Sequence, residues 1–226
     1  MPDMRGWQGR AMALGCLRNP GPGKTCPMRL LLAQVSPYSR KVRVLIREAG
    51  RLAEVDEVAV ATTPLAPSPD VMAANPAGRI PVLIRADGPA LHDSRVITRY
   101  LDARFGSGLY PDGRLWAVLT IESTAEGMID SALQMTYETR LRPPEQQSPA
   151  LMDAHWGKIA RSLDGLGDTW LSHLAGPPDM GQIALGCALG YLDLRHDARG
   201  WRQGRTALTD WYARFAQRPS MLDTAP

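Results

Sequence analysis

The chain has 226 residues, of which 44% are apolar and 22% are charged, as in soluble proteins with one large domain or two small ones. Its formal charge of +3 is too small for a nucleic-acid-binding protein, which carries a larger and more clustered positive excess. No apolar run approaches the roughly 20 residues that span a bilayer, so we expect neither a nucleic-acid nor a membrane partner.

The cysteines and histidines exclude further classes. Cys16, Cys26 and Cys187 are too few and too scattered for a disulfide framework or a zinc site, which favours a reducing, cytoplasmic compartment. The four histidines show no paired ligand spacing, so we assign no metal.

Residues 1–27 differ in character from the rest of the chain. They are rich in glycine and proline and show no sustained periodicity. Arg5, Arg10 and the apolar residues after them suggest a signal peptide only faintly, because the apolar run is short and no cleavage site is convincing. We expect a disordered extension over residues 1–27, or a chain that effectively begins at Met28.

A strand that turns into a helix follows. A continuous apolar run, Leu30 to Ala33, predicts a strand buried on both faces. The helix after it has an apolar face, with its basic residues on other faces (apolar Val42, Leu45, Ile46, Ala49; basic Arg40, Lys41, Arg43, Arg47). The switch falls at Ser36-Pro37, a preferred N-cap followed by a preferred first helical residue. A hydroxyl at a helix N-terminus is suited to binding an anion or holding a thiolate.

The first half continues as a small mixed sheet with helices. Alternation over 54–60 predicts a second strand, 70–74 a short helix ended by Asn75-Pro76, and 80–84 a third strand. A hairpin at Asp87-Gly88 leads to a strand over 90–92, and Asp93-Ser94 opens a helix. The order is βαβαββα.

The second half reads as all-helical. Residues 115–140 predict one long helix, Ser148-Pro149 opens another that runs to about Leu174, and a last helix covers about 207–217. The helix over 179–194 is apolar or small nearly all round, which predicts burial in the centre of a bundle. It starts with a variant capping box, Asp179 at the N-cap and Gln182 at N3.

Four motifs in this order and spacing resemble the cytosolic glutathione S-transferases. They are the Ser36–Val42 turn, the Asn75–Leu83 segment (NPAGRIPVL), the Asp93-Ser94 signature with Ile97 and Tyr100-Leu101, and the capped central helix. The resemblance covers about residues 28–220, and its later part looks most like a poorly characterised bacterial branch. It implies an α/β thioredoxin-like N-terminal domain over 28–106, a linker over 107–113 and an all-α C-terminal bundle domain over 114–226.

The resemblance implies that glutathione is the co-substrate and that Ser36 is catalytic. A hydroxyl hydrogen-bonded to the glutathione sulfur favours the thiolate. The alternative is that Ser36 only caps the helix. Tyr38 is the rival hydroxyl, to which we give at most a place in the acceptor pocket. No cysteine lies at 36–39, so a mixed disulfide between glutathione and a cysteine of this turn is excluded.

The resemblance also implies the other glutathione contacts. Pro81 would follow a cis peptide bond that turns the backbone of Ile80 towards the ligand, although a proline at a strand start is the alternative. Asp93 and Ser94 would bind the γ-glutamyl end, where either residue is also a possible helix cap. Arg79 would lie near the glycyl carboxylate, unless it is an ordinary solvated arginine.

The electrophile should lie between the domains, near Tyr38, Met128, Met135 and Tyr137, for each of which ordinary helix packing is the alternative. The leading function is a glutathione transferase acting on hydrophobic electrophiles in detoxification, as a homodimer by analogy. The alternatives are a glutathione-dependent peroxidase, reductase or isomerase on the same fold, or a non-catalytic binding module.

Overall fold

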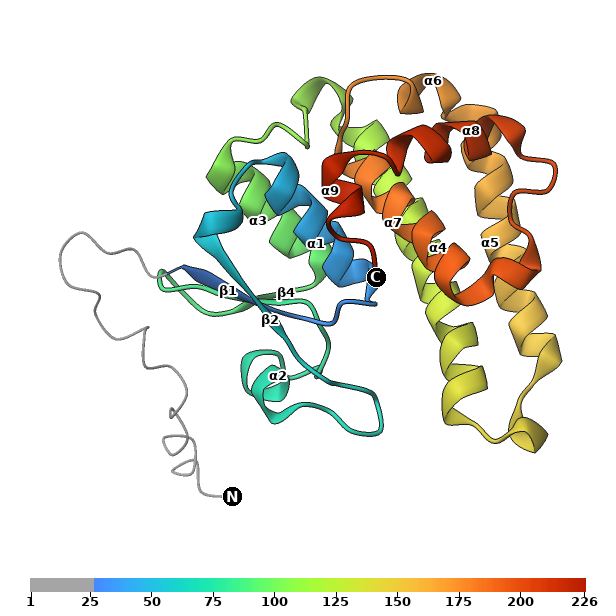
Figure 1. Cartoon of the computed structure of the whole chain (residues 1–226), viewed down its shortest axis with the longest axis horizontal. Helices are drawn as coiled ribbons and strands as arrows, with labels where there is room; N and C mark the ends of the chain where they lie inside the picture. The colour runs from blue at the N-terminus through green and yellow to red at the C-terminus, as the bar shows by residue number, and fades with distance from the viewer. Residues whose placement is uncertain (1–26) are drawn as a thin grey trace.

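The computed structural model describes residues 27–226, so the disordered extension expected over 1–27 lies outside the described residues except for Pro27. Figure 1 shows a sheet with helices on its two faces, beside a bundle of longer helices. The first part has the expected order: β1 (Met28–Leu32), α1 (Pro37–Glu48), β2 (Val55–Ala59), α2 (Pro69–Ala74), β3 (Val82–Ile84), β4 (Leu91–His92) and α3 (Ser94–Phe105).

The sheet has the strand order β2-β1-β3-β4, in which β1 is parallel to β2 and antiparallel to β3. Strand β1 is buried on both faces, as its apolar run predicts. Leu30 and Leu32 pack in the main core, whereas Leu31 packs with Val71 of α2 and Val82 of β3 in a smaller cluster. Helices α1 and α3 therefore cover one face and α2 the other (Figure 1).

Helix α1 is buried on more than its apolar face. Arg40, Lys41 and Arg43, which the sequence pattern places on the other faces, are 7%, 0% and 5% exposed. The reason is that α1 lies between the sheet and the helical part of the chain, where it packs against the central helix of the bundle. An amphipathic pattern locates one buried face of a helix and does not exclude a second.

The helical part comprises α4 (Leu115–Leu141), α5 (Pro149–Thr169), α6 (Leu171–Leu174), α7 (Met180–His196), α8 (Thr206–Phe215) and α9 (Pro219–Leu222). The helix predicted over about 207–217 is confirmed as α8, and α9 is a further short helix that was not predicted. One prediction needs correction: the second helix breaks at Trp170 before it reaches Leu174. Among residues 27–226, no helix combines the length and the apolarity needed to cross a membrane.

Helix α7 is the centre of the bundle, as predicted, because every residue from Met180 to Leu192 is buried. Asp179 caps it by accepting a hydrogen bond from Gln182 N at 3.1 Å. The other half of the expected capping box is not formed: the Gln182 amide donates to Pro177 O at 2.9 Å, in the preceding turn. The main core runs without interruption from the sheet to this bundle.

Candidate functional site

Three segments that the sequence singles out meet at one end of the strands of the sheet. Leu31 of β1 lies opposite Val82 of β3, which in turn lies opposite His92 of β4. The β1–α1 turn, the residues before Val82 and the residues after His92 therefore project from the same end of the three strands. This register places Ser36, Ile80-Pro81 and Asp93-Ser94 at the same end of the sheet.

Ser36 is the N-cap of α1, as predicted. Its Oγ accepts a hydrogen bond from Ser39 N at 3.3 Å. A hydroxyl has one proton to donate and two lone pairs, and among residues 27–226 no acceptor takes the Ser36 proton. The cap and a bond from Ser36 to an anion at the helix N-terminus are thus compatible.

A small pocket of about 10 Å³ contains Ser36 and brings together distant parts of the chain. Cys187 and Leu194 of α7 line it, as does Pro226 at the chain end. The chain end is held over α1 by Arg40, which donates to Met221 O at 2.9 Å. Burial raises the pKa of the Cys187 thiol to about 11, so this cysteine stays protonated near neutral pH.

Tyr38, the rival hydroxyl, is committed elsewhere. Its phenol donates a hydrogen bond to Asp130 Oδ1 of α4. Burial, and then the bond to the Asp130 carboxylate, raise the pKa of Tyr38, so the phenol keeps its proton. Because that single proton is shared with Asp130, Tyr38 has none to offer a sulfur atom.

The Ile80-Pro81 peptide bond is cis, as the resemblance implies. Ile80 precedes the strand ladder, which begins at Val82, and this shortens the strand predicted over 80–84 by two residues. Arg79 is exposed, and its carbonyl accepts a hydrogen bond from Asn75 Nδ2 at 2.8 Å.

Asp93 is the N-cap of α3 and has a φ of 71°, the one positive φ of a non-glycine residue in the described chain. Backbone in this region is uncommon for such residues and concentrates at functional sites. Its Oδ1 accepts a bond from Arg95 N at 2.8 Å. Burial acts to raise the pKa of Asp93, but the hydrogen bonds from Arg95 outweigh it and lower the pKa below its usual value.

Ser94 is buried and joins a polar network that links the sheet part to the bundle. Its Oγ donates to Glu126 Oε1 of α4 at 3.2 Å, and Lys41 of α1 donates to the same oxygen. Lys41 Nζ also lies 2.8 Å from Glu122 Oε1, to which the Tyr110 hydroxyl donates at 3.0 Å. The hydroxyl proton of Ser94 is therefore held by Glu126, whereas the backbone N–H of Ser94, at the start of α3, has no hydrogen-bond partner among residues 27–226.

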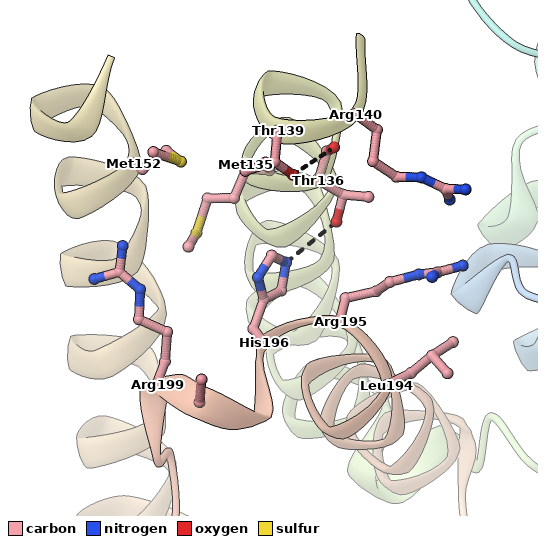
Figure 2. Close-up of a pocket in the computed structure, with 10 residues that line it drawn as sticks. Met135, Thr136, Thr139, Arg140, Met152, Leu194, Arg195, His196 and Arg199 are labelled. Carbon is pink, nitrogen blue, oxygen red and sulfur yellow. Dashed lines mark hydrogen bonds between the residues drawn. The ribbon is translucent and has the colours of Figure 1, made fainter. Parts of the chain in front are cut away.

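The proposed acceptor residues occupy three kinds of environment. Met128 is 1% exposed and packs in the main core. Tyr137 is half-buried, and burial raises its pKa. Met135 lines a pocket of about 390 Å³ at the end of α7 (Figure 2).

Sequence reasoning missed the acidic face of α4. Glu122, Glu126 and Asp130 recur every four residues, so they share one side of that helix. All three bind residues of the sheet part or the linker. The four-residue spacing was readable, but only the fold shows that this side faces α1 and α3. Among the described residues there is no cluster of three or more side chains suited to hold a metal ion.

Comparison with known families agrees with this architecture. The glutathione S-transferase N-terminal domain matches residues 35–104, and the C-terminal domain of the same family matches residues 149–214. The uncharacterized GST-like protein YibF of Escherichia coli K12 is 31% identical over 205 residues, covering 88% of this chain and 98% of YibF. The probable glutathione S-transferase BZ2 of Zea mays is 30% identical, covering 88% and 90%.

Solved structures are similar over the same range. A glutathione transferase family member from Pseudomonas fluorescens Pf-5, with bound glutathione, is 40% identical with a TM-score of 0.86, covering 88% of this chain and 98% of that one. A second structure from that organism, with bound S-(propanoic acid)-glutathione, has a TM-score of 0.82 at 40% identity, covering 88% and 99%. The chain belongs to the glutathione S-transferase family.

Proposed function

We propose that this protein is a glutathione transferase. Glutathione lies across the end of the sheet at Ser36, Ile80-Pro81 and Asp93-Ser94, with its sulfur above the N-terminus of α1. The thiolate attacks an electrophilic small molecule held between the sheet part and α4. The glutathione and the glutathione conjugate bound in the two Pseudomonas structures support this assignment.

The hydrogen-bonding state of Ser36 is the observation that carries the proposal. Ser36 caps α1 through an Oγ lone pair and still has its proton for a sulfur anion. Tyr38, two residues later, keeps its proton and donates it in a hydrogen bond to Asp130. Of these two hydroxyls, Ser36 is therefore the one able to stabilise the thiolate, together with the positive end of the helix.

The polar groups at this end of the sheet suit the remainder of the tripeptide. The backbone of Ile80 lies ahead of the β3 ladder, and in this proposal it pairs with the cysteinyl unit. The γ-glutamyl carboxylate binds the Ser94 N–H at the start of α3, and Asp93 and the carboxylate of Glu126 face its ammonium group. Exposed Arg79 takes the glycyl carboxylate.

The reaction needs only the thiolate and an electrophilic carbon. The thiol proton goes to solvent, the sulfur forms a bond to carbon, and the leaving group departs with its electron pair. The acceptor lies near Tyr38, Met135 and Tyr137. Met128 is buried in the core and supports these residues from behind. Chemistry through a cysteine of this site is disfavoured, because buried Cys187 keeps its proton.

A combined binding and turnover experiment tests the proposal. We expect calorimetry to show one glutathione site per chain, and the protein to conjugate a chloronitroarene. Ser36→Ala should lower kcat and leave glutathione affinity nearly unchanged, since each unit of thiol pKa changes the thiolate fraction about tenfold. Ser148→Ala is the matched control, because Ser148 caps α5 through the same 3.3 Å bond, also before a proline. Full activity of Ser36→Ala would contradict the assigned role.

We further propose that the protein is a cytoplasmic homodimer that detoxifies electrophiles. Family membership supports this assembly, in which the sheet part of one subunit contacts the bundle of the other. Sedimentation equilibrium at micromolar concentration is the direct measurement. A monomer across that range would contradict the homodimer and leave the assignment of Ser36 unaffected.

A further inference from the structure

A pocket lies at the C-terminal end of α7, between α4 and α5 (Figure 2). Its volume of about 390 Å³ falls within the range of small-molecule sites. Met135, Met152 and Leu194 give it an apolar lining, and Arg140, Arg195 and Arg199 bring three guanidinium groups. This combination suits a molecule with an apolar body and an anionic group.

The positive charge of the pocket is only partly neutralised within the described chain. Arg199 pairs with Asp153 at 2.8 Å. Among residues 27–226, neither Arg140 nor Arg195 forms a salt bridge, and the Nε of Arg195 is buried without a hydrogen-bond partner. A guanidinium without a carboxylate partner is a ready charge-assisted donor, so Arg195 and Arg140 can both bind an anion.

Helix ends explain part of this arrangement. Helices α4 and α7 both end at the pocket, and cations near a helix C-terminus are favourable. That effect accounts for the sign of the charge. It does not account for the buried Arg195 Nε, because an arginine serving only the helix end would donate to a terminal carbonyl.

His196 adds no positive charge to the pocket. Its Nε2 lies 2.9 Å from Ala132 O, an acceptor, so Nε2 carries the proton. Burial, together with the nearby charges of Arg199 and Arg195, lowers the pKa of His196, which favours the neutral ring. The guanidinium groups are therefore the cationic groups that line this pocket.

The pocket adjoins the proposed thiolate position through one residue. Leu194 lines both this pocket and the small pocket that contains Ser36. A molecule lying across Leu194 would have one end near the helix α1 N-terminus and the other near Arg195. Figure 2 shows Arg140 and Arg195 extending in the same direction, away from α5.

We propose that the electrophile taken by this protein carries a carboxylate, which Arg195 and Arg140 bind while an apolar body lies against Leu194. This inference rests on the proposed transferase function. With an aryl chloride as acceptor, the carbon–sulfur bond forms, the carbon–chlorine bond breaks, chloride leaves, and the thiol proton goes to solvent.

Two matched acceptors test the inference: 4-chloro-3-nitrobenzoate and its neutral amide, each rate being divided by the uncatalysed rate. We expect the wild-type protein to favour the benzoate in kcat/KM by about tenfold, the effect of one charge-assisted contact. Arg195→Gln should reduce this preference severalfold, by raising KM for the benzoate more than KM for the amide. Arg51→Gln, which removes an equal charge from an exposed pair with Glu54, should keep the preference.

The outcomes separate this inference from the proposed function. Conjugation of both compounds without a preference would overturn the carboxylate site and leave the transferase function standing. If neither compound is conjugated, calorimetry with the unreactive 4-nitrobenzoate decides. Binding that Arg195→Gln weakens by about tenfold and Arg51→Gln does not would still support an anion site, and the absence of binding would overturn it. Thermal unfolding confirms that each variant folds.

Discussion

Lys41 Nζ lies 2.8 Å from Glu122 Oε1, and the two side chains are 0% and 2% exposed. Glu126, which binds the same lysine, also accepts the hydroxyl proton of Ser94. A salt bridge buried between α1 and α4 thus reaches one of the proposed glutathione-binding residues. The packing of the sheet part on the bundle and the shape of the site depend on the same three charges.

Removal of Lys41 should destabilise the protein strongly. Lys41→Met leaves Glu122 and Glu126 buried without their cation, and losing one partner of a buried pair costs about 3–5 kcal/mol. Urea unfolding measures the loss. The triple variant with Glu122→Gln and Glu126→Gln should recover much of it, since no uncompensated charge remains. A loss below about 1 kcal/mol in Lys41→Met would show that the pair is solvated.

Two glycine substitutions should have opposite effects. A Cβ at Gly181 of α7 would lie 2.9 Å from Val118 O, a backbone atom of α4, so Gly181→Ala should destabilise by about 1–3 kcal/mol. A Cβ at Gly127 of α4 meets nothing within 4 Å, so Gly127→Ala should stabilise by about 0.5–1 kcal/mol through helix propensity. Equal effects in thermal unfolding would contradict the close contact of α4 and α7.

His196 should titrate below the usual histidine value of 6.5, because burial and the charges of Arg199 and Arg195 oppose its protonation. The unfolded chain then binds the proton at a higher pH than the folded protein. This contribution to stability is fully present above about 6.5 and decreases as the pH falls towards the folded pKa. Proton NMR measures the titration. Arg195→Gln should raise the His196 pKa, and an unchanged value would contradict the assigned cause.

The two serine caps should contribute equally to stability. Ser36→Ala and Ser148→Ala each remove a 3.3 Å bond to a backbone N–H three residues on, so each should cost about 1 kcal/mol. Denaturant midpoints measure both losses. A much larger loss in Ser36→Ala would mean that this variant cannot isolate the role of the hydroxyl.

The sequence predicts the fold well where the signal is local. The first strand, the Ser36-Pro37 start of α1 and the buried α7 follow from apolar runs and capping residues, and the structure confirms them. The strand covers Met28–Leu32 rather than ending at Ala33. The break at Trp170 and the short helix α9 were missed, because no proline or glycine marks the first and tertiary contacts hold the second. Arg218 and Ser220 bind Glu48 of α1, far away in sequence.

The proposed site is predictable in part for a related reason. Short sequence motifs contain Ser36, Ile80-Pro81 and Asp93-Ser94, so these residues could be predicted from the sequence. Only the strand register shows that they lie at the same end of the sheet. The salt bridge between Lys41 and Glu122 could not be predicted from the sequence, because charged residues on a helix usually face water. Here both side chains are buried because α1 and α4 pack together, although Lys41 and Glu122 are 81 residues apart in the chain.

The titration of bound glutathione tests the central claim most directly. The ultraviolet absorbance of the thiolate, measured against pH at saturating glutathione, gives the pKa of the bound thiol. We expect a value below about 8.5, the pKa of a free thiol, in the wild-type protein and in Ser148→Ala, and a return towards that value in Ser36→Ala. A bound thiol with an unshifted pKa in the wild-type protein, or the same lowered pKa in Ser36→Ala, would contradict the role assigned to Ser36.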